Sequence, residues 1–341
     1  MSSRPLPPFL ASERVYLIAE AEINHNGRLE TALDMVDTAR SLGADAVKFQ
    51  YVVADEIATR DSPYHALFKS VELSEAEFTQ VFARAAACGI DCFITVPSVA
   101  TLEPVLRLGP PILKVGSTNL TNIPLLREIG RTKVPVLFST GLGTLGEIED
   151  ALEALDATPE RVGFFHCTVK YPAPVGIVNL RAIPTMKSAF PGYAIGYSDH
   201  TEGDTAAVAA VALGARMIEK HFTLDRTQAG PDHAFSLDPP ALARFVGAVR
   251  DAEAALGHGI KRAAGEEAAA IRGGRRYLVA AGLIARGEAL TPANLVPRRI
   301  PADEDGIAPG MLDHIAGWQA PRDYRPGEAL SWSHFRAAQG G

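Results

Sequence analysis

The chain has 341 residues, 47% of them hydrophobic and 21% charged, which is typical of a folded protein with a sizeable core rather than a disordered one. Its 33 basic and 40 acidic residues give a formal net charge of -7, so its overall field repels phosphate backbones and anionic lipids. We therefore expect neither a nucleic-acid nor a membrane partner. No apolar stretch approaches the roughly 20 residues of a membrane helix, and segment 1–14 lacks the basic start and apolar run of a leader, which predicts a cytoplasmic protein.

Short apolar runs alternate with helical stretches along the first 257 residues. The runs, each typical of a buried parallel strand, are 15–22, 45–50, 91–96, 111–115, 134–139, 162–167, 193–197 and 216–221. The predicted helices are 29–42, 74–88, 99–108, 123–131, 144–155, 180–190, 205–213 and 239–256. Eight strand–helix units in about 250 residues predict a TIM (β/α)8 barrel. No G-x-G-x-x-G or P-loop follows any of the runs, which argues against an open doubly wound sheet.

The composition changes after residue 257 to a stretch rich in Gly, Ala and charged residues. We predict a barrel domain over 1–257, a linker over 258–275 and a second domain over 276–341. Within this tail the sequence Gly-Glu-Ala-Leu occurs at 287–290 and again at 327–330, which predicts two related hairpin-and-turn units. A mainly β domain of this size holds only a small core, so we expect it to lean on another surface.

Polar residues stand at the ends of the apolar runs, where the active site of a TIM barrel lies. Period-two alternation directs toward the barrel mouth Glu20 and Glu22, Lys48 and Gln50, Lys114, and Glu219 with His221. A lysine in a buried strand is rare unless it meets an anion, so Lys48 and Lys114 predict a phosphate or carboxylate pocket. The turns that follow add Ser117, Ser139 and Ser198 to it. The alternative is that each lysine pairs with an interior glutamate.

Histidines end two adjacent runs. His200 and His221 can share a divalent metal, or each can be a hydrogen-bonded structural residue. His25 stands in a turn, where it either forms hydrogen bonds or starts a helix, and His166 either faces the mouth or packs beneath it.

Several motifs stand in a fixed order along the chain. They are Ala-Glu at 19–20, Asn-His-Asn-Gly at 24–27, Gly-Ala-Asp-Ala-Val-Lys-Phe-Gln at 43–50, Lys-Val-Gly-Ser at 114–117, Ser-Thr-Gly at 139–141, Cys-Thr at 167–168 with Tyr-Pro at 171–172, Gly-Tyr-Ser-Asp-His at 196–200 and Lys-His-Phe-Thr-Leu-Asp at 220–225. Together they resemble the sialic acid synthase family. The tail, with Arg298, Arg299 and its two Gly-Glu pairs, looks like the antifreeze-like (SAF, β-clip) cap domain of those synthases.

The resemblance implies a reaction in which phosphoenolpyruvate condenses with an N-acylated amino-sugar aldehyde to a nine-carbon 2-keto-3-deoxy acid and phosphate. It implies catalytic roles for Glu20, Lys48, His200 and His221. The residues that would hold phosphoenolpyruvate are Lys48, Lys114, Ser117, Ser139 and Ser198. Those that would meet the sugar are Gln50, Asn119, Tyr171, Asp232 and Arg299. His200 and His221 would bind a divalent cation, Mn²⁺ first and Mg²⁺ or Co²⁺ as alternatives.

The resemblance also implies a homodimer in which each cap domain docks on the barrel of the partner. Arg299 then serves an active site only across that contact.

This sequence departs from the family pattern at four positions. Val96 stands where a hydroxyl near phosphoenolpyruvate is usual, Asn119 replaces an acidic residue, Val169 replaces an asparagine, and Glu22 replaces a glycine. The acceptor therefore stays open among precursors of sialic, legionaminic and pseudaminic acids.

Two other functions compete with this one. A Schiff-base aldolase on the same barrel would use Lys48 or Lys114 as its nucleophile. A non-catalytic sugar-phosphate binding protein is suggested by Val96, Asn119 and Val169.

Overall fold

The computed structural model describes residues 6–11, 13–263 and 265–338. Residues 1–5 and 12, part of the segment inspected for a leader, lie outside these ranges. The chain divides into two compact units, Met1–Gly257 and His258–Gly341, each described here by itself.

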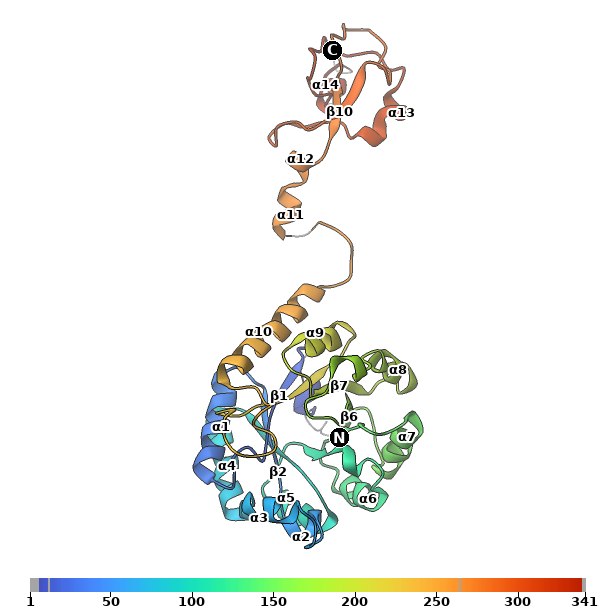
Figure 1. The fold of residues 1–341 in the computed structure, drawn as a ribbon. Helices are drawn as coiled ribbons and strands as arrows, with labels where there is room; N and C mark the ends of the chain where they lie inside the picture. The colour runs from blue at the N-terminus through green and yellow to red at the C-terminus, as the bar shows by residue number, and fades with distance from the viewer. Residues whose placement is uncertain (1–5, 12, 264, 339–341) are drawn as a thin grey trace. The chain divides into compact units, whose positions relative to one another are not determined.

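The first unit is a closed barrel of eight parallel strands in sequential order, so the predicted TIM barrel is confirmed. Each strand pairs with the next, and the last pairs with the first. Figure 1 shows the strands at the centre with the helices around them. The strands are β1 Tyr16–Glu22, β2 Ala46–Gln50, β3 Asp91–Thr95, β4 Leu113–Val115, β5 Val136–Ser139, β6 Val162–Cys167, β7 Ala194–Asp199 and β8 Met217–His221.

Helices follow the strands as the apolar spacing predicts. They are α1 Leu29–Ser41, α4 Glu75–Cys88, α5 Val99–Arg107, α6 Ile123–Thr132, α7 Leu145–Ala154, α8 Ala182–Ala189, α9 Thr205–Ala212 and α10 Pro239–Leu256. Ser74 caps α4 and Thr144 caps α7, each in a capping box with the glutamate three residues later. These caps satisfy backbone N–H groups that the first turn of each helix leaves without a partner.

Some boundaries differ from those predicted. β4 and β5 each begin two residues later, at Leu113 and Val136, because Pro111 and Pro135 have no N–H to enter the ladder. β7 extends two residues further, to Asp199. Two short helices after β2 were not predicted, since they are too short to show a helical period: α2 Ala54–Ile57 and α3 His65–Ser70.

The barrel interior below the mouth is filled by apolar side chains, which we call the interior plug. Its members are Phe9, Tyr16, Ile18, Ala46, Phe93, Ile112, Leu137, Phe165, Ala194 and Met217. Phe9 comes from a 3-10 helix, Pro8–Leu10, that precedes β1. A larger apolar layer fills the space between the strands and the helices. The interior of the barrel is thus a packed core rather than a pore.

The last helix of the barrel is fastened to the beginning of the barrel. Arg250 on α10 donates hydrogen bonds of 2.7 Å to the Val15 carbonyl and to the Asp45 carboxylate. Glu253 accepts the Val15 N–H, while Asp45 also accepts the N–H of Leu17 at 2.8 Å. One helix therefore ties together the starts of β1 and β2.

The second unit is a small domain with its own core, built around β9 Tyr277–Ala280 paired antiparallel with β10 Leu295–Arg298. Its short helices are α11 Gly265–Ala269, α12 Ile271–Gly274, α13 Leu312–Ile315 and α14 Trp332–Ala338. The two Gly-Glu-Ala-Leu segments turn on Gly287 and Gly327, whose φ angles of 86° and 81° suit glycine. The segments before these turns pair through reciprocal backbone hydrogen bonds between Ile284 and Tyr324.

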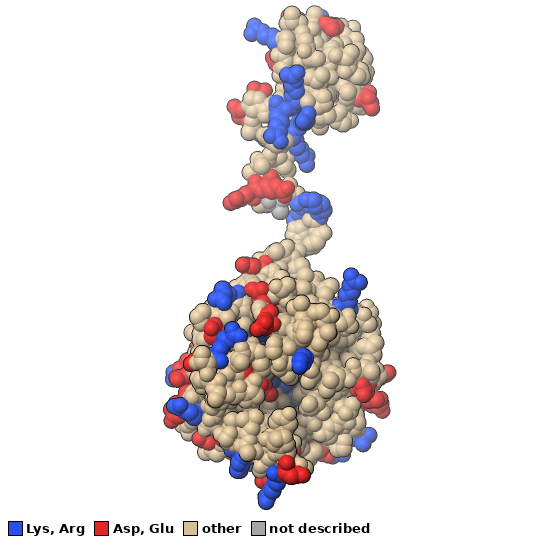
Figure 2. Space-filling model, in the orientation of Figure 1, with Lys and Arg blue, Asp and Glu red and all other residues tan. Residues whose placement is uncertain are grey.

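Acidic and basic side chains are interspersed on the face of the barrel unit shown in Figure 2. None of the helices in the described ranges is long and apolar enough to cross a bilayer.

Candidate active site at the barrel mouth

The C-terminal ends of the strands surround a cavity of about 560 Å³, which we call the mouth cavity. Residues from β1, β2, β4, β8 and the turns after β3, β4, β6 and β7 line it. Among the predicted site residues, the lining includes Glu20, Lys48, Gln50, Lys114, Ser117, Asn119, Tyr171, His200 and His221. The barrel thus gathers into one cavity residues that lie up to 201 positions apart in the sequence.

Lys48 lies at the bottom of the mouth cavity among acceptors. Its ammonium forms an ion pair with Glu20 on the neighbouring strand, donates to the Thr95 hydroxyl at 2.9 Å, and lies 3.7 Å from Glu219. Burial opposes the charged form, but Glu20 and Glu219 outweigh it and raise the pKa of Lys48 above its ordinary value. Burial also raises the pKa of Glu20, to about 8, against the opposing effect of Lys48.

Lys114 lies two strands further, on β4, and is more weakly paired. It donates to the Ser139 hydroxyl at 2.7 Å, and its distance to Glu219 is 3.8 Å. Burial lowers the pKa of Lys114 below its ordinary value. Glu219 accepts the Ser198 hydroxyl at 2.9 Å through Oε1, while its buried Oε2 has no hydrogen-bond partner among the described residues. Despite its burial, Lys114 and Lys48 hold the pKa of Glu219 below its usual range.

The sequence allows two interpretations of the buried lysines, an anion pocket and pairing with interior glutamates, and the structure has features of both. Interior glutamates do pair with them, as the alternative predicted, and hydroxyl groups surround them, as an anion pocket requires. Lys114 keeps bonding capacity for an incoming anion, because its ammonium has three N–H donors and donates to the Ser139 hydroxyl and, at 3.3 Å, to the Val115 carbonyl.

Another part of the wall comes from the turns after β4 and β6, which the turn after β5 supports. The Ser117 hydroxyl accepts the Gly141 N–H at 3.1 Å. A side chain at position 141 would collide with Val169 and Ser117, its Cβ lying 2.5 and 2.8 Å from them, so this close approach of backbone needs glycine. Asn119 donates to the Pro97 carbonyl at 3.1 Å and faces the cavity.

A metal-type cluster lies at one side of the mouth cavity. Ligand atoms of Glu22, His221 and Asp232 all fall within 4.8 Å of one another, a spacing compatible with a divalent cation. His221 Nδ1 is buried, lacks a hydrogen-bond partner among the described residues and lies 3.5 Å from the Glu22 carboxylate. Burial lowers the pKa of His221 well below its ordinary value, so the neutral ring keeps a lone pair for a cation. These donors fit a divalent ion.

His200 stands beside this cluster rather than in it. Its ring centroid lies 5.2 Å from that of His221. Nδ1 of His200 is 2.8 Å from the Thr168 carbonyl, which only accepts, so Nδ1 carries the proton and Nε2 keeps the lone pair. A backbone carbonyl on the second ring nitrogen is the usual support of a metal-binding histidine.

Aromatic rings close the side of the cavity next to the histidines. Tyr171 packs on His200 at 4.2 Å and on Phe235 at 5.3 Å between ring centroids. Phe235 also contacts the His221 ring, at 5.2 Å. Burial raises the pKa of the Tyr171 phenol, which therefore offers a neutral hydroxyl to a ligand.

Comparison with known proteins places the chain in a family. The NeuB family pattern matches residues 35–261 and the SAF domain pattern matches residues 275–336. The chain belongs to the NeuB family. It is 36% identical over 335 residues to N,N'-diacetyllegionaminic acid synthase of Campylobacter jejuni, across 93% of this chain and 99% of that protein. It is 33% identical over 344 residues to pseudaminic acid synthase of Campylobacter jejuni, across 96% of this chain and 98% of that protein.

A solved member of the family has the same architecture. N-acetylneuraminic acid synthetase from Leptospira borgpetersenii, crystallised in complex with citrate, superimposes with a TM-score of 0.71 at 35% identity, across 75% of this chain and 89% of that one. The resemblance drawn from the motifs is confirmed, and the chain is a synthase of the NeuB family with a C-terminal SAF domain.

One expectation about this NeuB-family chain needs correction. Val96 does not deprive the cavity of a hydroxyl, because Val96 packs between the barrel and the helices while Thr95 points inward and contacts Lys48. Glu22 lines the mouth cavity, as the alternation predicts, but β1 is irregular there: the strand pairs Glu20 with Lys48 and Glu22 with Phe49, and Glu22 has a φ of 41°.

The remaining histidines lie away from the cavity chemistry. His166 is directed outward and lies 2.6 Å from the Val178 carbonyl. His25 is fully buried next to Phe49, and burial lowers its pKa to about 4.

Functional positions outside the predicted set also emerge in this NeuB-family barrel. Glu219 bridges both lysines, and period-two alternation had already directed it to the mouth without giving it a role. Thr95 and Phe235 carry no signal of their own in one sequence, because a threonine at a strand end and a phenylalanine in a loop are common. Asp232, predicted to meet the sugar, lies in the metal-type cluster.

Arg299 belongs to the SAF unit, where it is exposed. It stays a predicted sugar contact.

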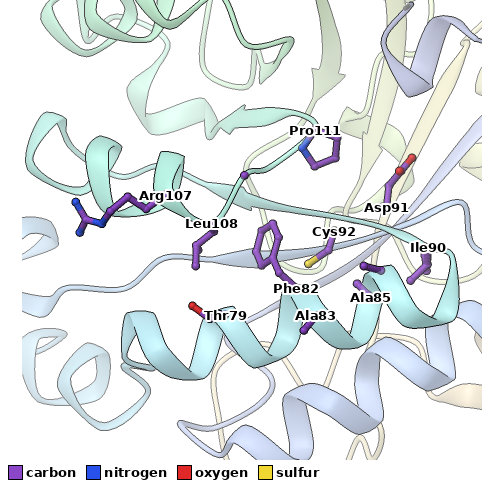
Figure 3. A pocket seen from close by; sticks show the side chains of 12 residues that line it. Thr79, Phe82, Ala83, Ala85, Ile90, Asp91, Cys92, Arg107, Leu108 and Pro111 are labelled. Atoms are coloured by element: carbon purple, nitrogen blue, oxygen red, sulfur yellow. The ribbon is translucent and has the colours of Figure 1, made fainter.

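A second hollow of the NeuB-family barrel lies at the other ends of the strands (Figure 3). It measures about 450 Å³ between α4 and the end of α5, and we call it the base hollow. Asp91, its lining carboxylate, is the first residue of β3 and accepts the Tyr16 hydroxyl at 2.8 Å. Burial raises the pKa of the Cys92 thiol there, which leaves it protonated and unreactive.

Proposed function

We propose that the protein condenses phosphoenolpyruvate with the open-chain aldehyde of an N-acylated amino sugar, releasing phosphate and forming a nine-carbon 2-keto-3-deoxy acid. The observation that carries this proposal is the pair of buried lysines, Lys48 and Lys114, set among hydroxyl groups next to the metal-type cluster. Phosphoenolpyruvate bears a carboxylate and a phosphate, and two neighbouring cations suit both. The names of the relatives, synthases of legionaminic and pseudaminic acids, support an N-acylated amino sugar as the acceptor.

The proposed chemistry balances as follows. Carbon 3 of phosphoenolpyruvate forms a bond to the aldehyde carbon, and the aldehyde oxygen takes up a proton. Water adds to carbon 2, the bond from carbon 2 to the phosphate oxygen breaks, and the products are the keto acid and hydrogen phosphate. A divalent cation supplies Lewis acidity to the aldehyde oxygen when it is bound.

The residues of the chain have separate roles in this proposal. Lys48 and Lys114 hold the anionic groups, with Ser117, Ser139 and Ser198 as hydroxyl partners. Glu219 fixes the two ammonium groups relative to each other. Glu20, paired with Lys48, is the carboxylate in position to accept the proton of the adding water. Gln50, Asn119 and Tyr171 line the part of the cavity that we assign to the sugar.

The cation site in this proposal contains His221 and, as a second imidazole, His200. Nε2 of His200 and Nδ1 of His221 are free of protein hydrogen bonds in the described part of the chain. Mn²⁺ is the ion we propose, because it accepts both imidazole and carboxylate ligands.

The test is phosphate release from phosphoenolpyruvate with Mn²⁺ and a panel of acceptors. The panel contains N-acetylmannosamine, its 6-phosphate and 2,4-diacetamido-trideoxyhexoses of differing configuration. We expect release with one class of sugar only, with the ¹⁸O label of the bridging oxygen recovered in phosphate and the keto acid identified by mass.

Other outcomes support the competing functions. Phosphoenolpyruvate binding without release for any sugar would indicate a binding protein. Covalent trapping of pyruvate on Lys48 or Lys114 by borohydride would indicate a Schiff-base aldolase. Trapping is abolished by Lys114→Met only if Lys114 is that nucleophile.

We propose further that the active assembly is a homodimer with exchanged SAF domains, in which Arg299 meets the sugar at the partner's barrel. The small size of the SAF core and the exposure of Arg299 support this arrangement.

The test mixes two inactive variants, Arg299→Ala and Lys48→Ala, after confirmed subunit exchange. Roughly half of the dimers are then mixed, and each has one intact site of two, so about a quarter of wild-type activity should return. If each SAF domain serves its own barrel, every site keeps one defect and no activity returns.

A further inference from the structure

Glu22 adopts a backbone conformation that ordinary side chains avoid. Its φ of 41° lies in the left-handed region, and the pairing of β1 with β2 shifts at this residue. A non-glycine residue there is held against its own steric preference, and such positions concentrate where a side chain has a task. The bulge turns the Glu22 carboxylate toward His221, at 3.5 Å from Nδ1.

His221 offers a ligand atom that nothing in the protein satisfies. Its side chain is only 6% exposed, and its Nδ1 has no hydrogen-bond partner in the described part of the chain. The 3.5 Å gap to Glu22 is too long for a good hydrogen bond. A buried unpaired nitrogen is costly unless something else fills the gap.

Asp232 completes the arrangement from the loop between β8 and α10. Its carboxylate, that of Glu22 and the His221 ring nitrogen lie within 4.8 Å of one another. One divalent ion among these atoms would have an imidazole nitrogen and two carboxylate oxygens as ligands. Two carboxylates side by side also repel each other, and a divalent cation removes that repulsion.

We propose that Glu22 is a direct ligand of the divalent cation, so that the carboxylates of Glu22 and Asp232 join the imidazole of His221 in holding the ion, with His200 as the second imidazole of the proposed site. Two carboxylate oxygens make the set harder than a pair of imidazoles, which favours Mn²⁺ or Mg²⁺. The inference rests on the proposed function for the use of this ion. Mn²⁺ binding itself is measured without turnover.

The experiment titrates the full chain with Mn²⁺ alone, using calorimetry and the electron paramagnetic resonance signal of free Mn²⁺. Glu22→Gln keeps the size and one oxygen but loses the charge, and we expect the dissociation constant to rise about tenfold. Glu22→Gly removes the ligand entirely, and we expect a rise of about a hundredfold. The matched control is Glu56→Gln, a cavity-lining glutamate outside the cluster, which should change the constant less than twofold.

A second readout separates a ligand from a structural residue. Glu22→Gly relieves the left-handed backbone, so the metal-free protein should melt at a higher temperature than the wild type. The stabilisation that Mn²⁺ adds should at the same time shrink, since that gain follows the affinity. A ligand therefore moves the two quantities in opposite directions.

Unchanged Mn²⁺ affinity in both Glu22 variants would overturn the inference, whether or not the enzyme is active. A protein whose Mn²⁺ binding depends on Glu22 but which releases no phosphate with any sugar would instead refute the proposed function and leave this ligand in place.

Discussion

The inward-facing side chains of the strands are apolar at one end of the barrel and polar or charged at the other. Toward the N-terminal ends the strands contribute the interior plug, which is apolar except for the Tyr16 hydroxyl. Toward the C-terminal ends they contribute Glu20, Lys48, Lys114, Ser139, Ser198 and Glu219, all buried. On β2 a single residue, Val47, separates Ala46 of the plug from Lys48 of the mouth. The contrast shows that the plug supplies stability, while the mouth holds charges that burial alone would disfavour.

The sharpest test of this contrast is Lys114→Met, which gives the mouth an apolar residue of the plug type. We expect the KM for phosphoenolpyruvate to rise far more than that for the sugar and kcat/KM for phosphoenolpyruvate to fall about a thousandfold, because a charge-assisted contact is lost. Steady-state kinetics with each substrate varied measures both constants. Lys69→Met, an exposed lysine on α3, is the control. Equal changes in the two KM values would contradict the anion-holding role.

The plug is tested by Phe93→Ala, which opens a cavity in its middle. Phe93 is fully buried, so we expect a loss of about 3–5 kcal/mol in the free energy of unfolding. Urea denaturation measures it, with Phe93→Leu as the conservative variant. Activity per folded molecule should stay near the wild-type value below the melting temperature. A large drop in kcat for Phe93→Leu without loss of stability would mean that the plug takes part in catalysis.

His25 tests a buried group outside the mouth cavity. Burial lowers its pKa to about 4, so between pH 6.5 and pH 4 the unfolded chain binds a proton that the folded chain does not. The neutral His25 ring therefore adds its full contribution to the free energy of unfolding above about pH 6.5. That contribution decreases as the pH falls, and about 2 kcal/mol of it is lost at pH 5. Urea denaturation of the wild type and His25→Gln at pH 7.5 and pH 5 measures this loss.

The His25→Gln protein should lose about 2 kcal/mol less than the wild type between the two pH values. His258→Gln, which alters an exposed histidine, should match the wild type. An equal pH dependence in all three proteins would exclude the buried neutral ring as its source.

The smallest effect is expected at the base hollow. Ala83→Gln places a longer side chain on α4, at the exposed edge of this hollow. Because the hollow is far along the strands from the mouth, kcat/KM should change less than twofold and stability by less than about 0.5 kcal/mol. A marked change in kcat/KM would give the base hollow a functional role.

The sequence was sufficient for the barrel and for most of the mouth. Buried parallel strands are continuous apolar runs, so their number and order follow from the sequence even where ends such as Leu113 shift by two residues. The mouth follows from alternation, which directed Lys48, Lys114 and Glu219 inward.

The parts that alternation could not reach share one cause, which is that their positions depend on breaks in regular structure. Alternation directed Glu22 to the mouth but gave no sign of the bulge that sets its backbone, and a long loop decides that Asp232 meets its carboxylate. The strand register decides that Thr95, and not Val96, points into the barrel, and a motif match does not reveal this register.

The tie between α10 and the start of the barrel bears on how the protein is made. Arg250 donates a hydrogen bond to Val15, which lies 235 positions earlier in the chain. β1 gains its second neighbouring strand only when β8 has been synthesised. Most of the barrel has therefore left the ribosome before β1 can pair on both sides. Closure through contacts so distant in the sequence is slow. Until then β1 presents a bare edge to other nascent chains, so the interval before α10 emerges is when this protein most needs a chaperone.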